Sequence, residues 1–421
     1  MEDYHTRTKH SYASIRNNPN YLDWEKQPPV FKNYEDFLSM IKLDDSLALH
    51  RLIYRIGGIT AKKVYPSTAY YLRTVPSAGA LYPVEFYFQC RDVEGFDDGI
   101  YHFDVKNSAV KLLHRIEEQE GVEVYFEDRR KIKGFLFLLS TIYYRSSWKY
   151  RDRAFRYCLL DAGHGLGTLE ASMYLEEMAC NIRYRFDKET LNKQFGFGDK
   201  EFFLSCVVAG APKSERAEFL ALNLEDANPK IERNLLIEEA YHHSCKVQNC
   251  KTNKRFESFN YDKKRFEEVI YQRRSIREFT KQSISKASFE VILENINKSI
   301  ISDCDEQVNI YYVVNRVRDM QKGLYLGNKL LKDGDFSIKA GYLCLEQALG
   351  RDSAVTFFLT TNSLNYQCAY QKAGYIGQRL YLSCEYLHIG CSGIGAYYDD
   401  EVLAFLDCPE EKVLYALAIG T

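Results

Sequence analysis

The sequence has no long hydrophobic run and almost no net charge. Its longest apolar stretch, Phe135 to Ile142, is far too short to cross a bilayer and is expected to be a buried strand. A net charge of −2 gives no electrostatic basis for binding nucleic acid or an anionic membrane. We expect no signal peptide at the N-terminus, and the 12 scattered cysteines predict a cytoplasmic protein with free thiols.

Two common functional motifs are incomplete. Gly196-Phe197-Gly198 lacks the third glycine and the βαβ context of a dinucleotide fingerprint, so we expect a loop there. His242-His243 with Cys245 and Cys250 offers poor zinc geometry, because Cys-x4-Cys beside adjacent histidines does not match the usual ligand spacing. The sequence therefore predicts neither a dinucleotide fingerprint nor a zinc centre.

Hydrophobic periodicity predicts an α+β chain of roughly two or three domains for its 421 residues. Ser285 is expected to cap the helix that follows it. The 33 tyrosines favour planar ligands or interfaces, although an unusual genomic composition explains them equally well. Helices are expected at 44–56, 159–173, 231–240, 285–296 and 373–387, and strands at 84–88, 135–142, 202–208, 308–314, 354–359 and 413–419.

The two halves of the chain repeat the same order of features. Each has an Ala-Gly-aromatic step, an apolar helical stretch, a cysteine, an aromatic-Asp pair and a strand closing on glycine. From Gly163 to Gly210 the distance is 47 residues, and from Gly374 to Gly420 it is 46. We therefore expect a fused dimer, with one domain at 1–212, a connector at 213–261 and a second domain at 262–421.

Three short segments carry potential chemistry. Arg273-Arg274-Ser275-Ile276-Arg277, expected at or near a helix start, suits phosphate oxygens, although a solvated basic helix end would look the same. Gly393-Ile394-Gly395-Ala396 lets a ligand approach the main chain, or else ends a helix. Pro76-Ser77-Ala78-Gly79-Ala80-Leu81-Tyr82-Pro83 is a turn of small side chains that leads into a strand.

Together these segments resemble the nitroreductase-like flavoprotein superfamily, and more narrowly the SagB/ThcOx family of FMN-dependent dehydrogenases. The turn Pro76–Pro83 matches the hallmark of that family. So does the block from Trp148 to Tyr157, followed by Asp161-Ala162-Gly163-His164. The resemblance implies two fused nitroreductase-like domains that form a pseudo-dimer and bind FMN.

In that superfamily two subunits share each flavin site, so the resemblance implies one composite FMN site per chain. The second half would give the arginine motif and the glycine loop, and the first half the Pro-Ser turn. The implied cofactor-binding residues are Arg273, Arg274, Ser275, Arg277, Pro76, Ser77, Gly79, Ala80, Leu81, Gly393, Ile394, Gly395 and Ala396. Many nitroreductases add basic residues after the last strand; here Arg379 or Arg16 is the expected substitute.

Lys149 and Tyr150 match the Lys-Tyr pair with which azoline-oxidising members remove a proton while hydride leaves to flavin N5. A lysine partly desolvated near arginines and a flavin would have a lowered pKa and could act as a base. The alternative is a basic, solvated loop, since Arg145, Arg151 and Arg153 lie nearby in the sequence.

We therefore expect an FMN-dependent oxidoreductase that oxidises a C–N or C–C bond in a small molecule or a modified peptide. One alternative is an NAD(P)H-dependent nitro- or quinone reductase, with a nicotinamide as electron donor. Another is a flavin-holding scaffold or docking subunit of a multi-enzyme assembly. No nucleic-acid or membrane partner is expected.

Overall fold

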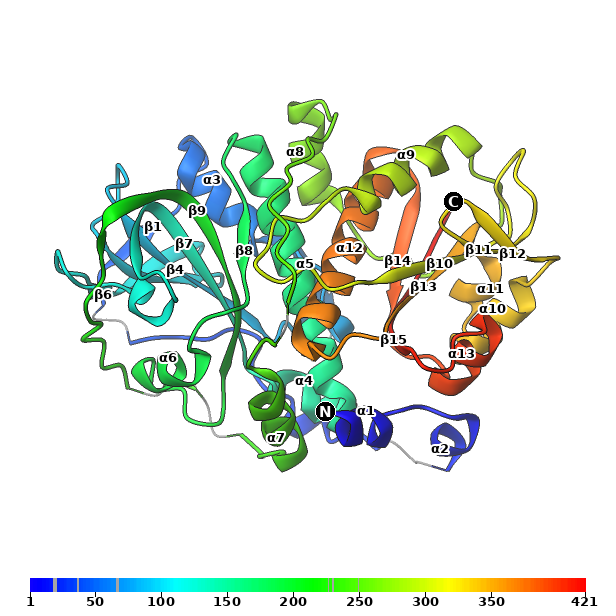
Figure 1. Ribbon diagram of the computed structural model, residues 1–421, viewed down its shortest axis with the longest axis horizontal. Coiled ribbons are helices and arrows are strands. Elements are labelled where there is room, and N and C mark those ends of the chain that lie inside the picture. Colours follow the sequence, from blue (N-terminus) through cyan, green and yellow to red (C-terminus); the bar gives the residue numbers. More distant parts are fainter. Residues whose placement is uncertain (18–20, 36–37, 66–67, 226, 229–230, 249) are drawn as a thin grey trace. The chain divides into compact units, whose positions relative to one another are not determined.

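The computed structural model describes the chain except for residues 18–20, 36–37, 66–67, 226, 229–230 and 249. The chain divides into two compact units, and Figure 1 labels most of their helices and strands. The N-terminal unit comprises Asp23–Phe256 and Ile300–Asp305. The C-terminal unit comprises Met1–Leu22, Glu257–Ser299 and Glu306–Thr421. Both units are discontinuous in sequence, unlike the continuous ranges expected from the repeat.

An antiparallel sheet forms the centre of the N-terminal unit. Its described strands lie in the order β1-β6-β5-β4-β7-β9-β8, and β2 and β3 form a separate hairpin. Side chains alternate across β4, so Phe86 faces Gly165 of a helix, whereas Tyr87 belongs to an aromatic core cluster with Phe195 and Phe203. The strands are β1 (Met40–Lys42), β2 (Ile59–Tyr65), β3 (Thr68–Arg73), β4 (Val84–Arg91), β5 (Gly99–Asp104), β6 (Ala109–Arg115), β7 (Arg130–Thr141), β8 (Asn181–Arg183) and β9 (Phe202–Arg216).

The long helix α5 packs against β4, β7 and β9. Nearly all of its residues are buried, including the polar side chains of Arg156, Asp161 and His164. Buried polar groups need hydrogen-bond partners, so these three side chains mark specific contacts rather than a solvated face. The helices of this unit are α3 (Ala48–Arg55), α4 (Tyr144–Tyr150), α5 (Ala154–Leu175), α6 (Lys188–Gln194) and α7 (Leu235–Ser244), with short 3-10 turns η1 (Trp24–Lys26), η2 (Ala78–Ala80), η3 (Val122–Tyr125) and η4 (Arg151–Arg153).

The C-terminal unit has the same plan. Its described strands form an antiparallel sheet in the order β12-β11-β10-β13-β15-β14. Both sheets therefore end in a long strand followed by a short edge strand, β9-β8 in one and β15-β14 in the other. The strands are β10 (Asn309–Val314), β11 (Gly323–Leu326), β12 (Lys329–Asp333), β13 (Val355–Thr361), β14 (Gly390–Ile394) and β15 (Lys412–Gly420).

Helix α12 packs against β14, β15, α8 and α9 and is buried along almost its whole length. The Ser285 side chain accepts a hydrogen bond from the Ser288 N–H and caps α9, which confirms the predicted cap. The helices are α1 (Glu2–Arg7), α2 (Tyr12–Arg16), α8 (Lys263–Gln272), α9 (Lys286–Asn297), α10 (Ser337–Leu343), α11 (Ala348–Asp352), α12 (Tyr366–Tyr386) and α13 (Asp399–Leu406).

Residues 1–22 are held to the C-terminal unit by main-chain and side-chain contacts. His10 and Asp399 exchange two hydrogen bonds, one from the His10 N–H to the Asp399 carboxylate (2.8 Å) and one from the Asp399 N–H to the His10 carbonyl (3.1 Å). The ring of His5 is buried and lies 3.3 Å from the Tyr366 hydroxyl. This arm is therefore ordered where the structure describes it.

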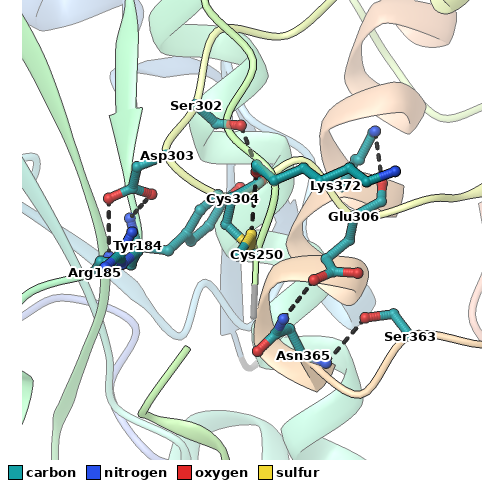
Figure 2. Close-up of a disulfide and its surroundings, with 11 residues drawn as sticks. Tyr184, Arg185, Cys250, Ser302, Asp303, Cys304, Glu306, Ser363, Asn365 and Lys372 are labelled. Carbon is teal, nitrogen blue, oxygen red and sulfur yellow. Dashed lines mark hydrogen bonds between the residues drawn. A yellow bond between two sulfur atoms is a disulfide. The ribbon is translucent and has the colours of Figure 1, made fainter. Parts of the chain in front are cut away.

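Residues 300–305 pair with the edge of the other sheet, in the N-terminal unit. The Ile182 N–H donates to the Ile301 carbonyl (3.0 Å), and the Asp303 N–H donates to the Ile182 carbonyl (3.1 Å). The Asp303 carboxylate also accepts the N–H groups of Tyr184 and Arg185 (Figure 2). Edge strand β8 is thereby covered on its open side.

A disulfide between Cys250 and Cys304 joins the same segment to the chain after α7 (Figure 2). The expectation that all cysteines are free thiols was therefore wrong, because these two lie 54 residues apart in sequence and meet only through the fold. The other ten cysteines, all among the described residues, keep their thiols. In the described residues no helix has the length and apolar content that a bilayer crossing requires.

Candidate active site

The Pro76–Pro83 turn, between β3 and β4, has an unusual backbone. Gly79, Ala80 and Tyr82 have positive φ values of 65°, 54° and 46°. Such a conformation costs a non-glycine residue about 1–3 kcal/mol, so it persists only when neighbouring groups hold it. The Tyr82 N–H donates to Ser77 Oγ (2.9 Å), and the Ser77 hydroxyl in turn donates to Asp161 Oδ2 (2.5 Å). The Ala78 N–H donates to Asp161 Oδ1 (3.3 Å).

A buried ion pair fixes the end of the turn. Arg145 Nη1 donates to the Tyr82 carbonyl (2.8 Å) and to Glu85 Oε1 (2.5 Å). His102 Nε2 lies 2.8 Å from the other Glu85 oxygen. Burial raises the pKa of Glu85, but the charge of Arg145 and the hydrogen bond of His102 outweigh it and lower that pKa to about 2. Glu85 is therefore ionised at neutral pH and holds Arg145 in place.

The predicted Lys-Tyr pair lies against this turn. Lys149 and Tyr150 form the end of α4. A Cβ atom built on Gly79 would lie 2.7 Å from the Tyr150 hydroxyl and 3.3 Å from Lys149 Nζ. Only glycine leaves room for both groups at this point. The Tyr150 ring also packs on Tyr157 of α5, with the ring centroids 4.4 Å apart. The structure thus brings together Gly79, Lys149 and Tyr150.

A cavity of about 250 Å³ lies beside the same turn. The residues that line it are Ala80 of the turn, Ala69, Tyr70 and Tyr71 of β3, and Gln27, Pro28 and Val30. Two tyrosine rings and a glutamine contribute to its walls. It is small for a whole ligand and large enough for one side chain.

Asp161 holds the Pro76–Pro83 turn, a role that was not predicted from the sequence. It is 5% exposed, and burial raises the pKa of its carboxyl group to about 7 despite hydrogen bonds from Ser77 and Ala78. A sequence signal existed, because an acidic residue between Leu160 and Ala162 in an apolar helix must find a partner.

The arginine motif does not lie at a helix start, and that prediction was wrong. Arg273 follows the last residue of α8, and the chain then runs extended, with Ser275 bridged to Cys391 on β14. The Ile276 N–H donates to the Cys391 carbonyl (3.2 Å). The arginine motif therefore has no helix N–H groups to donate to a ligand. Its side chains are the donors that a ligand could meet.

Tyr381 of α12 connects the arginine motif to the glycine segment, and sequence analysis missed it. Its hydroxyl lies 2.8 Å from Ser275 Oγ and accepts the Gly393 N–H (2.6 Å). The guanidinium of Arg273 lies over its ring, 5.3 Å from the centroid. Burial raises the pKa of Tyr381 to about 12, so the hydroxyl keeps its proton. One tyrosine in an apolar helix gives no sequence signal for this role.

The other predicted cofactor residues lie in different settings. Arg274 Nη1 donates to the Tyr271 carbonyl (3.0 Å) and so caps α8, whereas Arg277 is exposed. Arg379 donates to the main-chain carbonyls of Lys298 and Ser299 after α9. Residues two apart on a helix do not share a face, so Arg379 points away from the side of α12 that carries Tyr381.

The remaining predicted residues lie near these two groups. Ile394 ends β14 and is buried, while Gly395 and Ala396 follow it, half-buried. A Cβ atom built on Gly393 would lie 2.0 Å from the Tyr415 hydroxyl, so this strand position requires glycine. Leu81 is buried within the turn. Arg16 forms an exposed ion pair with Glu346 (3.0 Å).

The cysteines and histidines after α6 do not gather as a metal site in the described residues. His242 pairs with Glu189 at 3.0 Å, and the Cys245 thiol lies 3.3 Å from the His242 carbonyl. Cys250 is bound to Cys304. The histidines and cysteines of this stretch are therefore engaged in other contacts.

Parts of the chain are similar in sequence to known proteins. Residues 270–421 match the Nitroreductase family. The "Putative nitroreductase MJ1384" of Methanocaldococcus jannaschii is 28% identical over 145 residues, covering 30% of this chain and 68% of that protein. "Trifolitoxin-processing protein TfxB" of Rhizobium leguminosarum bv. trifolii is 31% identical over 120 residues, covering 27% of this chain and 32% of that protein.

A crystal structure of a "putative nitroreductase" from Anabaena variabilis matches the whole fold. The TM-score is 0.81 at 25% sequence identity, and the match covers 100% of this chain and 98% of the other. The chain therefore contains a nitroreductase-family domain at residues 270–421, and it has a nitroreductase fold throughout. The predicted α+β class with nitroreductase-like units is confirmed. Family and fold point to an oxidoreductase.

Proposed function

We propose that this chain is an FMN-dependent oxidoreductase of the SagB/ThcOx type, in which substrate gives up a hydride to the flavin. The observation that carries the proposal is the placement of Lys149 Nζ and the Tyr150 hydroxyl against Gly79 of the Pro76–Pro83 turn. A base and a proton relay beside a small-residue turn suit the removal of a proton from a substrate that also loses a hydride.

The arginine motif fits the anionic end of FMN. Arg273 is held by the Tyr381 ring, Ser275 is exposed beside it, and Arg277 extends into solvent. Guanidinium groups with a hydroxyl provide the donors that a phosphate needs. Gly393 leaves room for the Tyr415 hydroxyl and donates its N–H to Tyr381, so it fixes the glycine segment beside this group. Arg379 is a poorer candidate, because main-chain carbonyls already occupy its guanidinium.

Bound FMN would supply the two-electron acceptor at N5. Lys149 in its neutral form would accept the substrate proton at Nζ, and Tyr150 would hold the substrate heteroatom or pass the proton on. Tyr157 and Gly79 limit the positions that Tyr150 can take. The fixed Arg145–Glu85 pair keeps the turn in register with β4.

A modified peptide is the proposed substrate. The similarity to a protein named for trifolitoxin processing supports this class, although the match spans about a third of that protein. The cavity beside Ala80 has the volume of one side chain and two tyrosine rings in its lining, which suits a residue flanking the oxidised bond.

We also propose that the two residue groups serve the same FMN. The N-terminal unit holds the Pro76–Pro83 turn with Lys149 and Tyr150, and the C-terminal unit holds the arginine motif and Gly393. The two groups are complementary, and together they make up the set that the family uses around one flavin.

A second candidate is an NAD(P)H-dependent nitro- or quinone reductase, since one curated relative and one matching crystal structure are named as nitroreductases. In that case a nicotinamide would reduce the flavin, and Lys149 would bind substrate without acting as a base.

The two functions differ in one anaerobic experiment. Purified protein with FMN is mixed with an azoline-containing peptide, with NADH or with NADPH, and the flavin absorbance is followed. We expect bleaching by the peptide in the wild type and a loss of about 10²–10⁴ in its rate for Lys149→Ala, with FMN still bound. Lys133→Ala, an exposed lysine on β7, is the matched control. Bleaching by NADH or NADPH alone, unchanged in Lys149→Ala, would establish the reductase instead.

A further inference from the structure

Asp161 is a buried carboxyl group without a cation. Two other buried carboxylates of the N-terminal unit have one: Glu85 lies 2.5 Å from Arg145, and Glu201 lies 2.5 Å from Lys32. Among the described residues Asp161 has no such ion pair, and its partners are the Ser77 hydroxyl and the Ala78 N–H. Burying a carboxylate in this way is costly, and a neutral side chain would pack there more cheaply.

One face of α5 contacts both the Pro76–Pro83 turn and Tyr150, the two groups that meet at Gly79. Tyr157 and Asp161 are four residues apart and therefore lie on the same side of the helix. Tyr157 packs on the Tyr150 ring, and Asp161 holds the Pro76–Pro83 turn. The distance between the turn and Tyr150 is thus set by two neighbouring positions of a single buried helix.

The Ser77 hydroxyl has one proton to donate, and its partners indicate the acceptor. Ser77 Oγ accepts the Tyr82 N–H, so its own O–H is free to donate to an ionised Asp161. If the carboxyl group is protonated, its O–H can donate to Ser77 Oγ instead. The Ser77 proton can then turn to another acceptor.

We propose that Asp161 is a positioning residue of the proposed flavin site, and that its protonation state sets whether Ser77 donates to Asp161 or to the flavin. This inference rests on the proposed function, because it needs FMN beside the turn. With Asp161 neutral, Ser77 gives the flavin a hydrogen bond. With Asp161 ionised, Ser77 donates to Asp161 and the flavin loses that hydrogen bond. The buried Asp161 carboxylate then also carries a negative charge next to the turn.

Burial places this change near neutral pH, since the pKa of Asp161 is about 7. The other titratable groups around it are Tyr157, Cys158 and His164 on α5, and Lys149 and Tyr150 across Gly79. Burial raises the pKa of Cys158 to about 12, so its thiol stays neutral throughout. Asp161→Asn keeps all five groups and removes only the titrating carboxyl.

The test is a fluorescence titration of FMN into the purified full-length chain at about pH 6 and about pH 8. The FMN phosphate also titrates near pH 6, so the readout is the difference between wild type and Asp161→Asn. From the lower to the higher pH, the Kd of the wild type for FMN should rise by a factor about threefold to tenfold larger than the factor for the variant. This is the change in affinity expected for the loss of one hydrogen bond. Thr168→Val is the matched control, because it removes a buried hydroxyl that bonds only within α5.

Equal pH dependence of the FMN Kd in wild type and Asp161→Asn would overturn the inference. The inference would also be overturned if Thr168→Val lost the pH dependence that the wild type shows. If Asp161 has a purely structural role, Asp161→Asn should lower the melting temperature and leave the pH dependence of FMN binding in place. If Asp161→Asn does not fold, Ser77→Ala replaces it and should also abolish the wild-type excess. A wild-type chain that binds no FMN at either pH would contradict the proposed function itself.

Discussion

Two carboxyl groups near the Pro76–Pro83 turn show how single residues set its chemistry. Glu85 faces Arg145 and His102, and its pKa is lowered to about 2, whereas Asp161 faces only neutral donors and has a pKa of about 7. Both are buried. Glu85 is therefore a permanent anion that fixes Arg145, and Asp161 is a group that changes charge in the physiological range.

Asp161→Asn should change how stability depends on pH. The pKa of Asp161 is raised from 3.8 to about 7 on folding, so the folded chain holds more protons than the unfolded chain between these values. The stability that Asp161 contributes is therefore greatest below about pH 4 and is lost as the pH rises to about 7. Relative to wild type, the variant should gain stability over this window, by at most about 1.4 kcal/mol per pH unit.

The measurement is the free energy of unfolding in urea at several pH values between about 5 and 8. A difference between variant and wild type that stays constant across this range would show that Asp161 does not titrate there. Thr168→Val again serves as the comparison, since its effect should not depend on pH.

Among the elements, α12 joins two segments that are far apart in the sequence. Tyr381→Phe removes the hydroxyl that meets Ser275 and the Gly393 N–H, and so leaves that N–H without its partner. We expect a loss of about 1–3 kcal/mol in stability and weaker FMN binding, because the arginine motif loses its connection to β14. Unfolding in urea and FMN titration measure the two effects.

Tyr370→Phe is the matched control on the same helix. It also removes a buried hydroxyl, which donates to the Val413 carbonyl (3.3 Å), but it does not touch the arginine motif. It should lose stability and keep its FMN affinity. If both variants bind FMN like wild type, Tyr381 has only a packing role.

The disulfide is a second element-level feature with a measurable effect. Cys250 and Cys304 close a long stretch of chain and fasten residues 300–305, and such a cross-link is typically worth about 2–4 kcal/mol. Reduction, or Cys304→Ser, should lower the free energy of unfolding by that amount. A thiol assay in denaturant without reductant should find ten free thiols; a count of all 12 would show that the bond does not form in solution.

Sequence patterns located the core strands and the long helices, because period and burial are local properties. The strand predicted at 135–142 is β7 (Arg130–Thr141), and the one predicted at 202–208 is β9, which continues to Arg216. The arginine motif was misplaced, since its extended course depends on pairing with Cys391, more than a hundred residues away. The disulfide and the pairing of residues 300–305 with β8 were not predicted, for the same reason.

At the scale of the whole molecule, the two units share a plan but differ at one register position. Gly393 on β14 pairs with Leu417, three residues before the closing Gly420. Ile182 on β8 pairs with Val207, three residues before the corresponding Gly210. The C-terminal unit thus has a glycine where the N-terminal unit has a branched side chain.

This difference predicts one FMN per chain. At Ile182 the main chain is already engaged, because its N–H donates to Ile301 and its carbonyl accepts the Asp303 N–H. A flavin there would meet a branched side chain beside an edge that residues 300–305 already cover, whereas Gly393 has no side chain. Absorbance of released FMN against protein concentration should give a ratio near one. Ile182→Gly should leave that ratio unchanged, because residues 300–305 still cover β8; a ratio near two in the wild type would show that the covered edge does not exclude a second flavin.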